Sequence, residues 1–300
     1  MYLNILLGSV EQGLLYSIMV LGVYLTFRVL DYADLTVDGS FPLGAAVAAI
    51  LIVSGYNPLF ATLAAIAAGA VAGMITGALH TQFKIAPLLS GILSMIALYS
   101  INLRVMGRAN ISLLRQNTVY TQLVGLGLSD SWVVTAVGII AAVGVVAVLW
   151  WFLNTELGFA MRATGDNAQM IRSLGVNTNA MKIIGLSLSN AMVAFSGALV
   201  TQYQSFADVG MGIGMIVVGL ASVIIGEVLF GTTTIFRTLV AVAMGSVVYR
   251  LVIAIVLQLG LKPTDLKLFT ALIVTFALAS PIMKGKLQAA LGRRKDGHNA

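Results

Sequence analysis

The chain has 300 residues, of which 59% are hydrophobic and only 9% are charged, and its mean hydropathy is +0.98. A soluble domain carries roughly a quarter of its residues as charged side chains, so this composition indicates an integral membrane protein. The net charge of +6 resides in short loops and the C-terminal tail, which reflects membrane topology, and we expect no nucleic-acid partner. The absence of cysteine excludes disulfides and thiolate chemistry, and two histidines cannot form a metal cluster.

The first predicted membrane span covers residues 9–30, with its polar residues at the two ends. Glu11 and Gln12 lie at its start, so the first dozen residues are expected to lie along the membrane surface before the chain turns inward. Arg28 and Asp31 mark the other end, because charged side chains are costly in the hydrocarbon core.

The segment 31–44 is polar, and the apolar run that follows it ends near Ser54. This run is too short to cross a hydrocarbon core of about 30 Å without part of the polar segment. We therefore expect Asp34, Asp38 and Gly39 to enter the membrane region as irregular backbone, which is tolerated only inside protein or beside a water-filled cavity. A carboxylate at that depth is by default functional. The alternative is an ordinary cytoplasmic loop.

The next two spans are predicted at 59–79 and 86–106. The first has glycines at every fourth residue on one helical face, a stripe that lets a second helix approach closely: Gly69, Gly73 and Gly77. The second carries Ser90, Ser94 and Asn102 as its polar residues. These side chains either line a polar path or bond back to carbonyl groups of their own helix.

The second half of the chain alternates apolar runs with breaks. A mixed loop at 107–131, with room for a short surface helix, leads to spans predicted at 132–153, 183–203 and 213–230. The run 232–261 is either one long span or a span plus a half-helix, and 264–283 forms the last span. Arg250 therefore either faces a polar interior or lies near the surface where the helix breaks.

The two interrupted elements, 31–44 and the glycine-rich break 204–214, lie in different halves of the chain. By analogy with secondary transporters, such a pair indicates a translocation path. The whole pattern predicts an all-α membrane protein, a polytopic helical bundle of about nine transmembrane spans with broken helices. Residues 1–283 form a single transmembrane domain, and 284–300 form a basic cytoplasmic tail.

A polar island at 154–182 interrupts the apolar runs. Its centre predicts a short amphipathic helix over 166–174, with Asp166 and Asn167 suited to cap its start and Gly175 suited to end it. The helix is either a binding site for a protein outside the membrane or an ordinary loop helix on the lipid surface.

The run Gly158-Phe-Ala-Met-Arg-Ala-Thr-Gly-Asp-Asn, followed by Ala168, Ser173-Leu-Gly175 and Asn177, resembles the coupling loop of bacterial ABC importer permeases. The family serves branched-chain amino acids, ribose and related solutes. The segment Gly39-Ser-Phe-Pro-Leu-Gly-Ala45 is similar to its broken second element. The runs from Asp34 and from Pro87 look most like a subgroup assigned to aromatic amino acids.

The resemblance implies a permease domain with a cytoplasmic coupling helix, without a cofactor of its own. Its implied partners are a cytoplasmic ABC ATPase, an extracytoplasmic solute-binding protein, membrane lipid and a second permease copy, as a homodimer or a close heterodimer. The implied ATPase-coupling residues are Arg162, Gly165, Asp166, Asn167, Met170, Ile171, Leu174 and Gly175. The implied translocation path contains Asp34, Asp38, Gly39, Ser40, Phe41, Leu89, Ser90, Leu93, Ser94, Gly212 and Gly214.

The basic residues predict the orientation in the bacterial cytoplasmic membrane. With the tail inside, 11 of them lie in the cytoplasm: Arg28, Lys84, Arg162, Arg172, Lys182, Arg237, Lys284, Lys286, Arg293, Arg294 and Lys295. With Arg250 set aside, five lie outside: Arg104, Arg108, Arg115, Lys262 and Lys267. The excess inside places the polar island in the cytoplasm and the N-terminus outside.

The sequence contains no G-x-x-x-x-G-K-[ST] loop, so ATP hydrolysis is expected on a separate subunit and the chain is not expected to be an enzyme. One alternative is an ion-coupled secondary transporter with proton or sodium sites at Asp34, Asp38 or Glu227. Another is a passive channel. These alternatives need no ATPase, so transport by the isolated chain distinguishes them from the importer.

Overall fold

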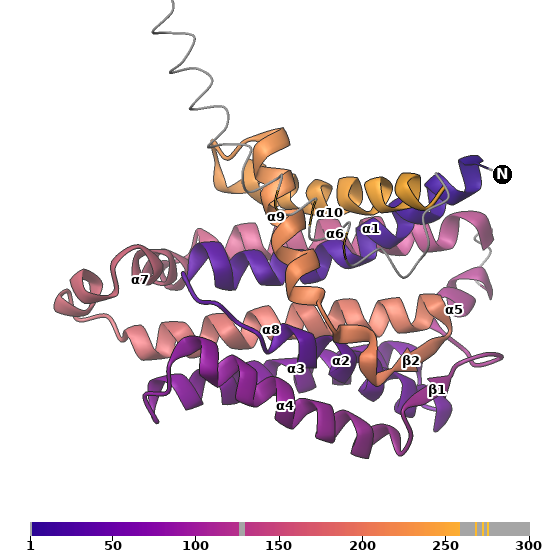
Figure 1. The fold of residues 1–300 in the computed structure, drawn as a ribbon, viewed down its shortest axis with the longest axis horizontal. Helices are drawn as coiled ribbons and strands as arrows, with labels where there is room; N and C mark the ends of the chain where they lie inside the picture. The colour runs from indigo at the N-terminus through magenta and orange to yellow at the C-terminus, as the bar shows by residue number, and fades with distance from the viewer. Residues whose placement is uncertain (1, 126–129, 259–267, 269–271, 273–274, 276–300) are drawn as a thin grey trace, which may run out of the picture.

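The computed structural model describes residues 2–125 and 130–258, together with positions 268, 272 and 275. This part of the chain is almost entirely helical, and its long helices lie side by side (Figure 1). Seven of the described helices are long and apolar enough to cross a membrane, and α2 is a shorter apolar helix. Apart from the three isolated positions, the predicted span 264–283 and the tail 284–300 lie outside the described residues.

The elements follow one another along the chain with short connections. They are α1 (Tyr2–Tyr24), the π-helical turn η1 (Leu25–Val29), α2 (Val37–Val53), α3 (Pro58–Thr81), α4 (Pro87–Met106), β1 (Asn110–Ser112), α5 (Val119–Gly125), α6 (Asp130–Leu153), α7 (Glu156–Ser173), α8 (Thr178–Gln204), β2 (Phe206–Asp208), the 3-10 turn η2 (Val209–Gly212), α9 (Met215–Phe230) and α10 (Ile235–Gln258).

The most buried spans are α8 and α1, which pack against each other at the centre of the bundle. Helix α3 lies along α8, and the predicted glycine stripe makes that approach possible. A Cβ atom at Gly69 or Gly73 would collide with the α8 backbone at Asn190 or Leu186, respectively. The assignment of this stripe to helix packing is therefore confirmed.

Helix α1 differs from its prediction at its start and ends, through η1, at the predicted place. It begins at Tyr2 and continues through η1 to Val29, so no separate surface segment precedes the span. Glu11 is buried within the bundle, where its Oε1 accepts a hydrogen bond of 2.9 Å from the Thr135 hydroxyl on α6. Because this partner replaces water, the carboxylate does not have to remain at the membrane surface.

Helix α10 settles an alternative that the sequence leaves open. It is one helix over Ile235–Gln258, and Arg250 lies inside it. The guanidinium carbon lies 3.7 Å from the centre of the Tyr16 ring on α1, in cation–π geometry. Arg250 therefore faces another helix, and no break in α10 exposes it.

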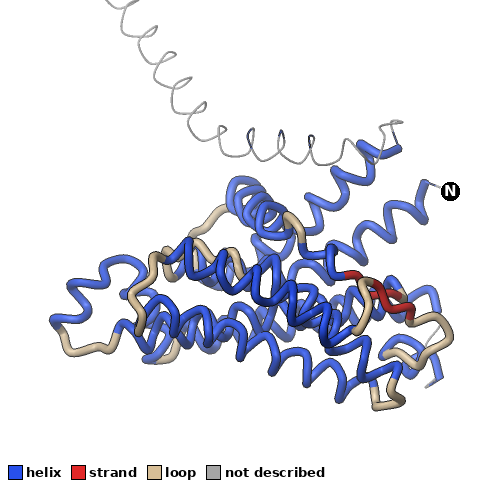
Figure 2. Tube along the Cα trace, turned by 60° about the horizontal axis from the view of Figure 1, so that its bottom comes forward, coloured by secondary structure: helices blue, strands red, loops and turns tan. Residues whose placement is uncertain are grey.

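Two short strands were not predicted. Strands β1 and β2 pair antiparallel, with Ile111 opposite Ala207, and join the loop after α4 to the break after α8 (Figure 2). Ile111, Leu113 and Ala207 are buried against α2. In the loop predicted to hold a surface helix, α5 instead buries Tyr120, whose hydroxyl donates to the Leu199 carbonyl of α8.

Candidate functional site

The first interrupted element is the segment between η1 and α2, which lies inside the bundle. Asp34 is 1% exposed. Its Oδ1 accepts from the backbone N–H of Thr36 at 2.9 Å, and its Oδ2 accepts from the Asn190 amide of α8 at 2.7 Å. The prediction that this carboxylate enters the protein interior is confirmed. Hydrogen bonding by protein groups makes such burial tolerable.

A chain of hydroxyl groups ties the same segment to α3 and α4. Thr36 Oγ1 lies 2.9 Å from Thr76 Oγ1, which donates to Ser94 Oγ at 2.7 Å. One turn away, the Tyr32 hydroxyl lies 2.5 Å from Ser90 Oγ. The Ser90 hydroxyl also donates to the Pro87 carbonyl of its own helix. Ser94 thus joins α4 to α3, and Ser90 joins α4 to the segment before α2, inside the protomer.

The second interrupted element runs from Ser205 to Gly214. Ser205 and Gly214 both have left-handed backbone angles, with φ of 60° and 86°, and these residues end α8 and begin α9. Between them lie β2 and η2. The Asp208 side chain accepts from the backbone N–H of Gly210 at 2.7 Å and caps η2. The predicted break is confirmed, although its strand and its 3-10 turn were not predicted.

Asp38 connects the two interrupted elements. It lies, like Gly39, in the first turn of α2, so the prediction of irregular backbone is wrong at these two residues. Its carboxylate accepts from the backbone N–H groups of Gly214 at 3.0 Å and Ile216 at 2.8 Å. These donors are unpaired N–H groups at the start of α9. The carboxylate therefore lies at the positive ends of two helices, where a negative charge is stabilised.

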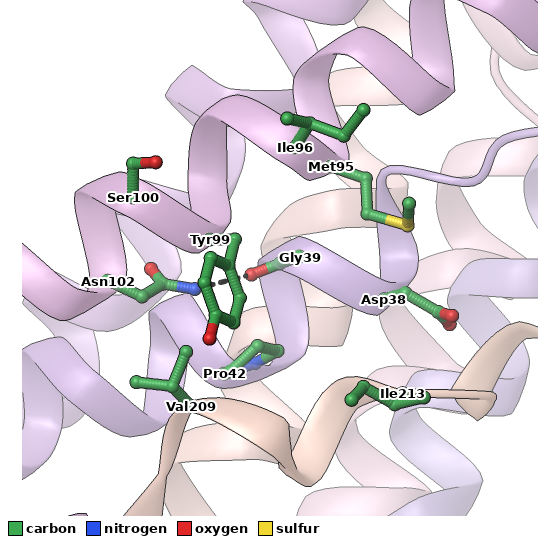
Figure 3. A pocket seen from close by; sticks show the side chains of 10 residues that line it. All are labelled: Asp38, Gly39, Pro42, Met95, Ile96, Tyr99, Ser100, Asn102, Val209 and Ile213. Carbon is green, nitrogen blue, oxygen red and sulfur yellow. Dashed lines mark hydrogen bonds between the residues drawn. The ribbon is translucent and has the colours of Figure 1, made fainter. Parts of the chain in front are cut away.

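A cavity of about 360 Å³ lies between α4 and the chain before α9 (Figure 3). Met95, Ile96 and Tyr99 form its α4 wall. The Asn102 amide points at the Gly39 carbonyl and donates to it at 3.1 Å. Its Oδ1 is buried and has no hydrogen-bond donor among the described residues. The remaining lining residues are Asp38, Pro42, Ser100, Val209 and Ile213. The lining is mostly apolar with a few polar groups, as in small-molecule sites.

Helix α7 begins ten residues before its predicted start and has two parts. Asn167 interrupts it, with φ of −155° and ψ of 90°. In the first part, a Cβ at Gly165 would collide with the Val29 carbonyl at the end of η1, so helix and turn lie in direct backbone contact. Thr155 caps this part by accepting from the Gly158 N–H at 3.3 Å, a start that the sequence analysis missed.

The second part of α7 corresponds to the predicted amphipathic helix. Asn167 Oδ1 accepts from the Met170 N–H at 2.9 Å, so the structure assigns this cap to Asn167 and not to Asp166. Gly175 has φ of 88° directly after the helix, as its predicted role requires. Met170 is 52% exposed and Leu174 is 70% exposed. Met170 and Leu174 are thus uncovered within the protomer, at the end of the bundle where α7 projects (Figure 1), whereas Ala168 and Ile171 of the predicted apolar face are partly buried.

A family model described as the permease component of branched-chain amino acid transport systems matches residues 5–279. The chain belongs to this permease family. It is 43% identical to a tyrosine transport system permease protein of Clostridioides difficile over 275 residues, 92% of this chain and 90% of the relative. It is 34% identical to an uncharacterized protein of Rickettsia prowazekii over 282 residues, 93% and 98% of the two chains.

A more distant relative of this permease is the autoinducer 2 import system permease protein LsrC of Salmonella choleraesuis. The two are 26% identical over 231 residues, 75% of this chain and 62% of that protein. No solved structure matches the chain. Family membership and the apolar helices identify a multi-pass transport permease of the cytoplasmic membrane.

The predicted path residues of the permease occupy four different settings. Asp38 and Gly39 line the cavity. Buried inside the protomer, away from the cavity lining, are Asp34, Ser40, Phe41, Ser90 and Ser94. Leu89 and Leu93 are exposed on α4, while Gly212 and Gly214 position the start of α9. A Cβ at Gly212 would collide with the Asp38 carbonyl, so this contact requires glycine.

The sequence analysis missed Met95 and Tyr99 as cavity residues of α4, although it named Asn102 as a candidate path residue. Met95, Tyr99 and Asn102 lie at positions i, i+4 and i+7, on one helical face. This spacing could have placed them together, but it does not distinguish a cavity wall from a packed core. Ile213 has no such signal, because it precedes α9 in an irregular segment.

Proposed function

We propose that this permease is the membrane subunit of an ABC importer and is driven by a separate cytoplasmic ATPase. The observation that carries the proposal is the uncovered apolar face of Met170 and Leu174 on a capped helix outside the membrane-spanning bundle. An amphipathic helix with such a face is suited to a groove on a partner protein. ATPase docking at α7 is the role we assign to it.

The distribution of basic residues supports a cytoplasmic α7. Among the described residues, six basic side chains belong to the end of the bundle that carries α7: Arg28, Lys84, Arg162, Arg172, Lys182 and Arg237. With Arg250 inside α10 set aside, three belong to the opposite end: Arg104, Arg108 and Arg115. Cytoplasmic loops carry the excess of Lys and Arg, so α7 faces the cytoplasm in our proposal.

The contact between α7 and η1 supplies a route for coupling. Gly165 lies against Val29, and the segment after η1 leads to Asp38, which holds the start of α9. At its other end, α9 carries Glu227, which forms a bidentate ion pair with Arg28 of η1. Displacement of α7 by an ATPase would therefore act on both interrupted elements through η1.

A second permease copy is proposed to complete the solute path. The cavity beside α4 opens toward an exposed surface that carries Tyr99, Ile96 and Ile213. Its polar groups, Asp38 and Asn102 among them, are unfavourable neighbours for lipid chains. Covering this surface with another copy places the cavity between two protomers, below a solute-binding protein on the extracytoplasmic side.

We propose an aromatic amino acid as the solute. The support is the relative that is named for tyrosine transport and is 43% identical to this chain. The apolar wall formed by Met95, Ile96 and Tyr99 suits an aromatic ring. The polar groups at Asn102 and Ser100 are then available to a polar solute end.

The ion-coupled alternative is less well supported, because protein groups engage each candidate carboxylate. Asp34 is held by Asn190, Asp38 by the start of α9, and Glu227 by Arg28. None of these arrangements resembles an open cation site. A passive channel is likewise less well supported, because it needs no partner protein that would cover the exposed face of α7.

Reconstitution in proteoliposomes tests the proposal. The permease should take up tyrosine only when the ATPase, ATP and the binding protein are present. Uptake driven by a proton or sodium gradient in the isolated chain would overturn it in favour of a secondary transporter. Conductance without a binding protein would favour a channel.

A further inference from the structure

A second cavity, of about 840 Å³, lies at the end of the bundle that carries α7. It is lined by the end of α1 with η1, by the first part of α7, by the second half of α9 and by the start of α10. The cavity beside α4 lies next to the start of α9, so the two cavities lie toward opposite ends of this helix. They share no lining residue.

The charged side chains that line the second cavity are balanced in sign. Arg28 and Arg162 are positive, and Asp166 and Glu227 are negative. Arg28 and Glu227 neutralise each other in their ion pair. Arg162 and Asp166 form no ion pair within residues 2–125 and 130–258. One guanidinium and one carboxylate at the same cavity therefore lack an opposite charge.

Arg162 and Asp166 lie close together on α7. They are four residues apart, before the interruption at Asn167, and so share one helical face. The Arg162 guanidinium lies over the Phe159 ring, 5.3 Å from its centre, and its buried Nη1 has no acceptor among the described residues. Its hydrogen-bonding capacity is therefore only partly used. The planar donor pair of arginine fits a carboxylate.

The pairing of one free guanidinium with one free carboxylate selects the class of ligand. A simple anion would meet the carboxylate of Asp166, and a simple cation would meet the guanidinium of Arg162. A zwitterion with a carboxylate and an ammonium group satisfies both. Exposed hydroxyl groups of Thr232 and Thr233 on the same lining offer further acceptors to an ammonium group. The volume lies in the range of small-molecule sites.

One apolar face of α9 leads from the first cavity to the second. Val217, Leu220, Ile224 and Val228 lie at positions i, i+3, i+7 and i+11, on one side of the helix. Val217 is 40% exposed in the first turn of α9, and Ile224 and Val228 line the second cavity. An apolar side chain of a solute can therefore stay in contact with α9 between the two cavities.

We propose that the second cavity is a cytoplasmic-side site for the zwitterionic head of an α-amino acid. The solute carboxylate binds Arg162, the ammonium group binds Asp166, and the solute side chain lies against Ile224 and Val228. This inference rests on the proposed function as an amino-acid importer. It adds a place where the solute binds after the α4 cavity and before release.

Protection of an introduced thiol tests the site in the purified full chain. The sequence contains no cysteine, so Thr232→Cys carries a single thiol at the cavity lining. L-Tyrosine should slow its alkylation by N-ethylmaleimide. Gln82→Cys, exposed at the same end of the bundle and away from the cavity lining, is the matched control and should react at an unchanged rate. Equal slowing at both thiols would overturn the proposal.

The two charges of the ligand are tested separately in Thr232→Cys. Tyramine lacks the carboxylate and 3-(4-hydroxyphenyl)propionate lacks the ammonium group, so neither should protect as L-tyrosine does. Adding Arg162→Gln should raise the L-tyrosine concentration for half-protection about tenfold, because a charge-assisted hydrogen bond is lost. Asp166→Asn, at an exposed position where misfolding is not expected, should weaken protection as well. Full protection by either analogue, or in both variants, would overturn the zwitterion site.

Failure of this site is distinguishable from failure of the proposed function. Protection by L-leucine and not by L-tyrosine would support the site and remove the aromatic solute. Protection without ATP-driven uptake in proteoliposomes would support the site and overturn the importer. ATP-driven uptake with no protection by either amino acid would overturn the site alone.

Discussion

The Asp38 carboxylate, in the first turn of α2, accepts a hydrogen bond of 2.8 Å from the backbone N–H of Ile216, in the first turn of α9. A side chain of α2, the helix that follows the first interrupted element, thus caps the helix that follows the second. The two irregular segments are thereby fixed relative to each other, and the cavity beside α4 lies next to this junction.

Replacement of Asp38 should separate the two interrupted elements. Asp38→Ala removes both acceptors from the start of α9 and should lower the free energy of unfolding by about 1 kcal/mol, as loss of a helix cap does. Solute uptake should fall as well, because the start of α9 beside the cavity is no longer held by the Asp38 carboxylate. Asp38→Asn keeps one acceptor oxygen, so its unfolding free energy and its uptake should lie between those of wild type and Asp38→Ala.

Thermal unfolding in detergent and uptake in proteoliposomes measure both effects of these Asp38 variants. Asp31→Asn is the control, since it removes an exposed carboxylate from the segment that precedes α2. Normal unfolding and uptake in Asp38→Ala would show that the cap is dispensable.

The charge pair of Arg28 and Glu227 should connect η1 to the far end of α9. Arg28 has a side-chain exposure of 47% and Glu227 one of 13%, so solvent screening limits the pair to about 1 kcal/mol. Arg28→Glu should reduce uptake through like-charge repulsion. The double variant Arg28→Glu with Glu227→Arg should recover part of it.

A double-mutant cycle, measured by unfolding and by uptake, gives the coupling between Arg28 and Glu227. If the double variant loses as much uptake as the two single variants together, the charges act independently. That result would remove the pair from the coupling route.

The features predicted correctly from the sequence are those that depend on local composition and spacing. Apolar runs located the membrane helices, and the spacing of Gly69, Gly73 and Gly77 predicted the packing of α3. The shortness of the run after Asp34 placed that carboxylate in the interior. Each of these follows from length or from periodicity along one helix.

The unpredicted features are contacts between distant segments. The bond from Gly214 to Asp38 joins residues 176 positions apart, and β1 pairs with a strand nearly a hundred residues later. A three-residue strand is too short to show a period, and a capping residue from another helix leaves no local pattern. The roles assigned to the coupling and path residues stay predictions.

Contact between α7 and η1 should be sensitive to a single methyl group. Gly165→Ala places a Cβ where the Val29 carbonyl lies, so the helix and the turn must move apart. We expect a loss of about 1–3 kcal/mol in unfolding free energy, which is typical of overpacking, and weaker coupling of ATP hydrolysis to uptake. Gly144→Ala on α6 is the matched control, because no atom lies within 4 Å of its added Cβ.

The ratio of ATP hydrolysed to solute transported measures that coupling in Gly165→Ala. An unchanged ratio alongside a lowered melting temperature would assign Gly165 a packing role alone. A raised ratio is the outcome expected of a damaged route from α7 to η1.

The exposed face of α7 should carry the ATPase contact. Leu174→Asp and Met170→Asp place a charge on an apolar surface that a partner would bury, so co-purification of the ATPase and uptake should both be lost. The melting temperature of the isolated permease should not change, because both side chains are exposed in the protomer. Gln169→Asp adds the same charge to a neighbouring exposed polar position and should preserve ATPase binding. ATPase that remains bound to Leu174→Asp would move the docking surface away from this helix.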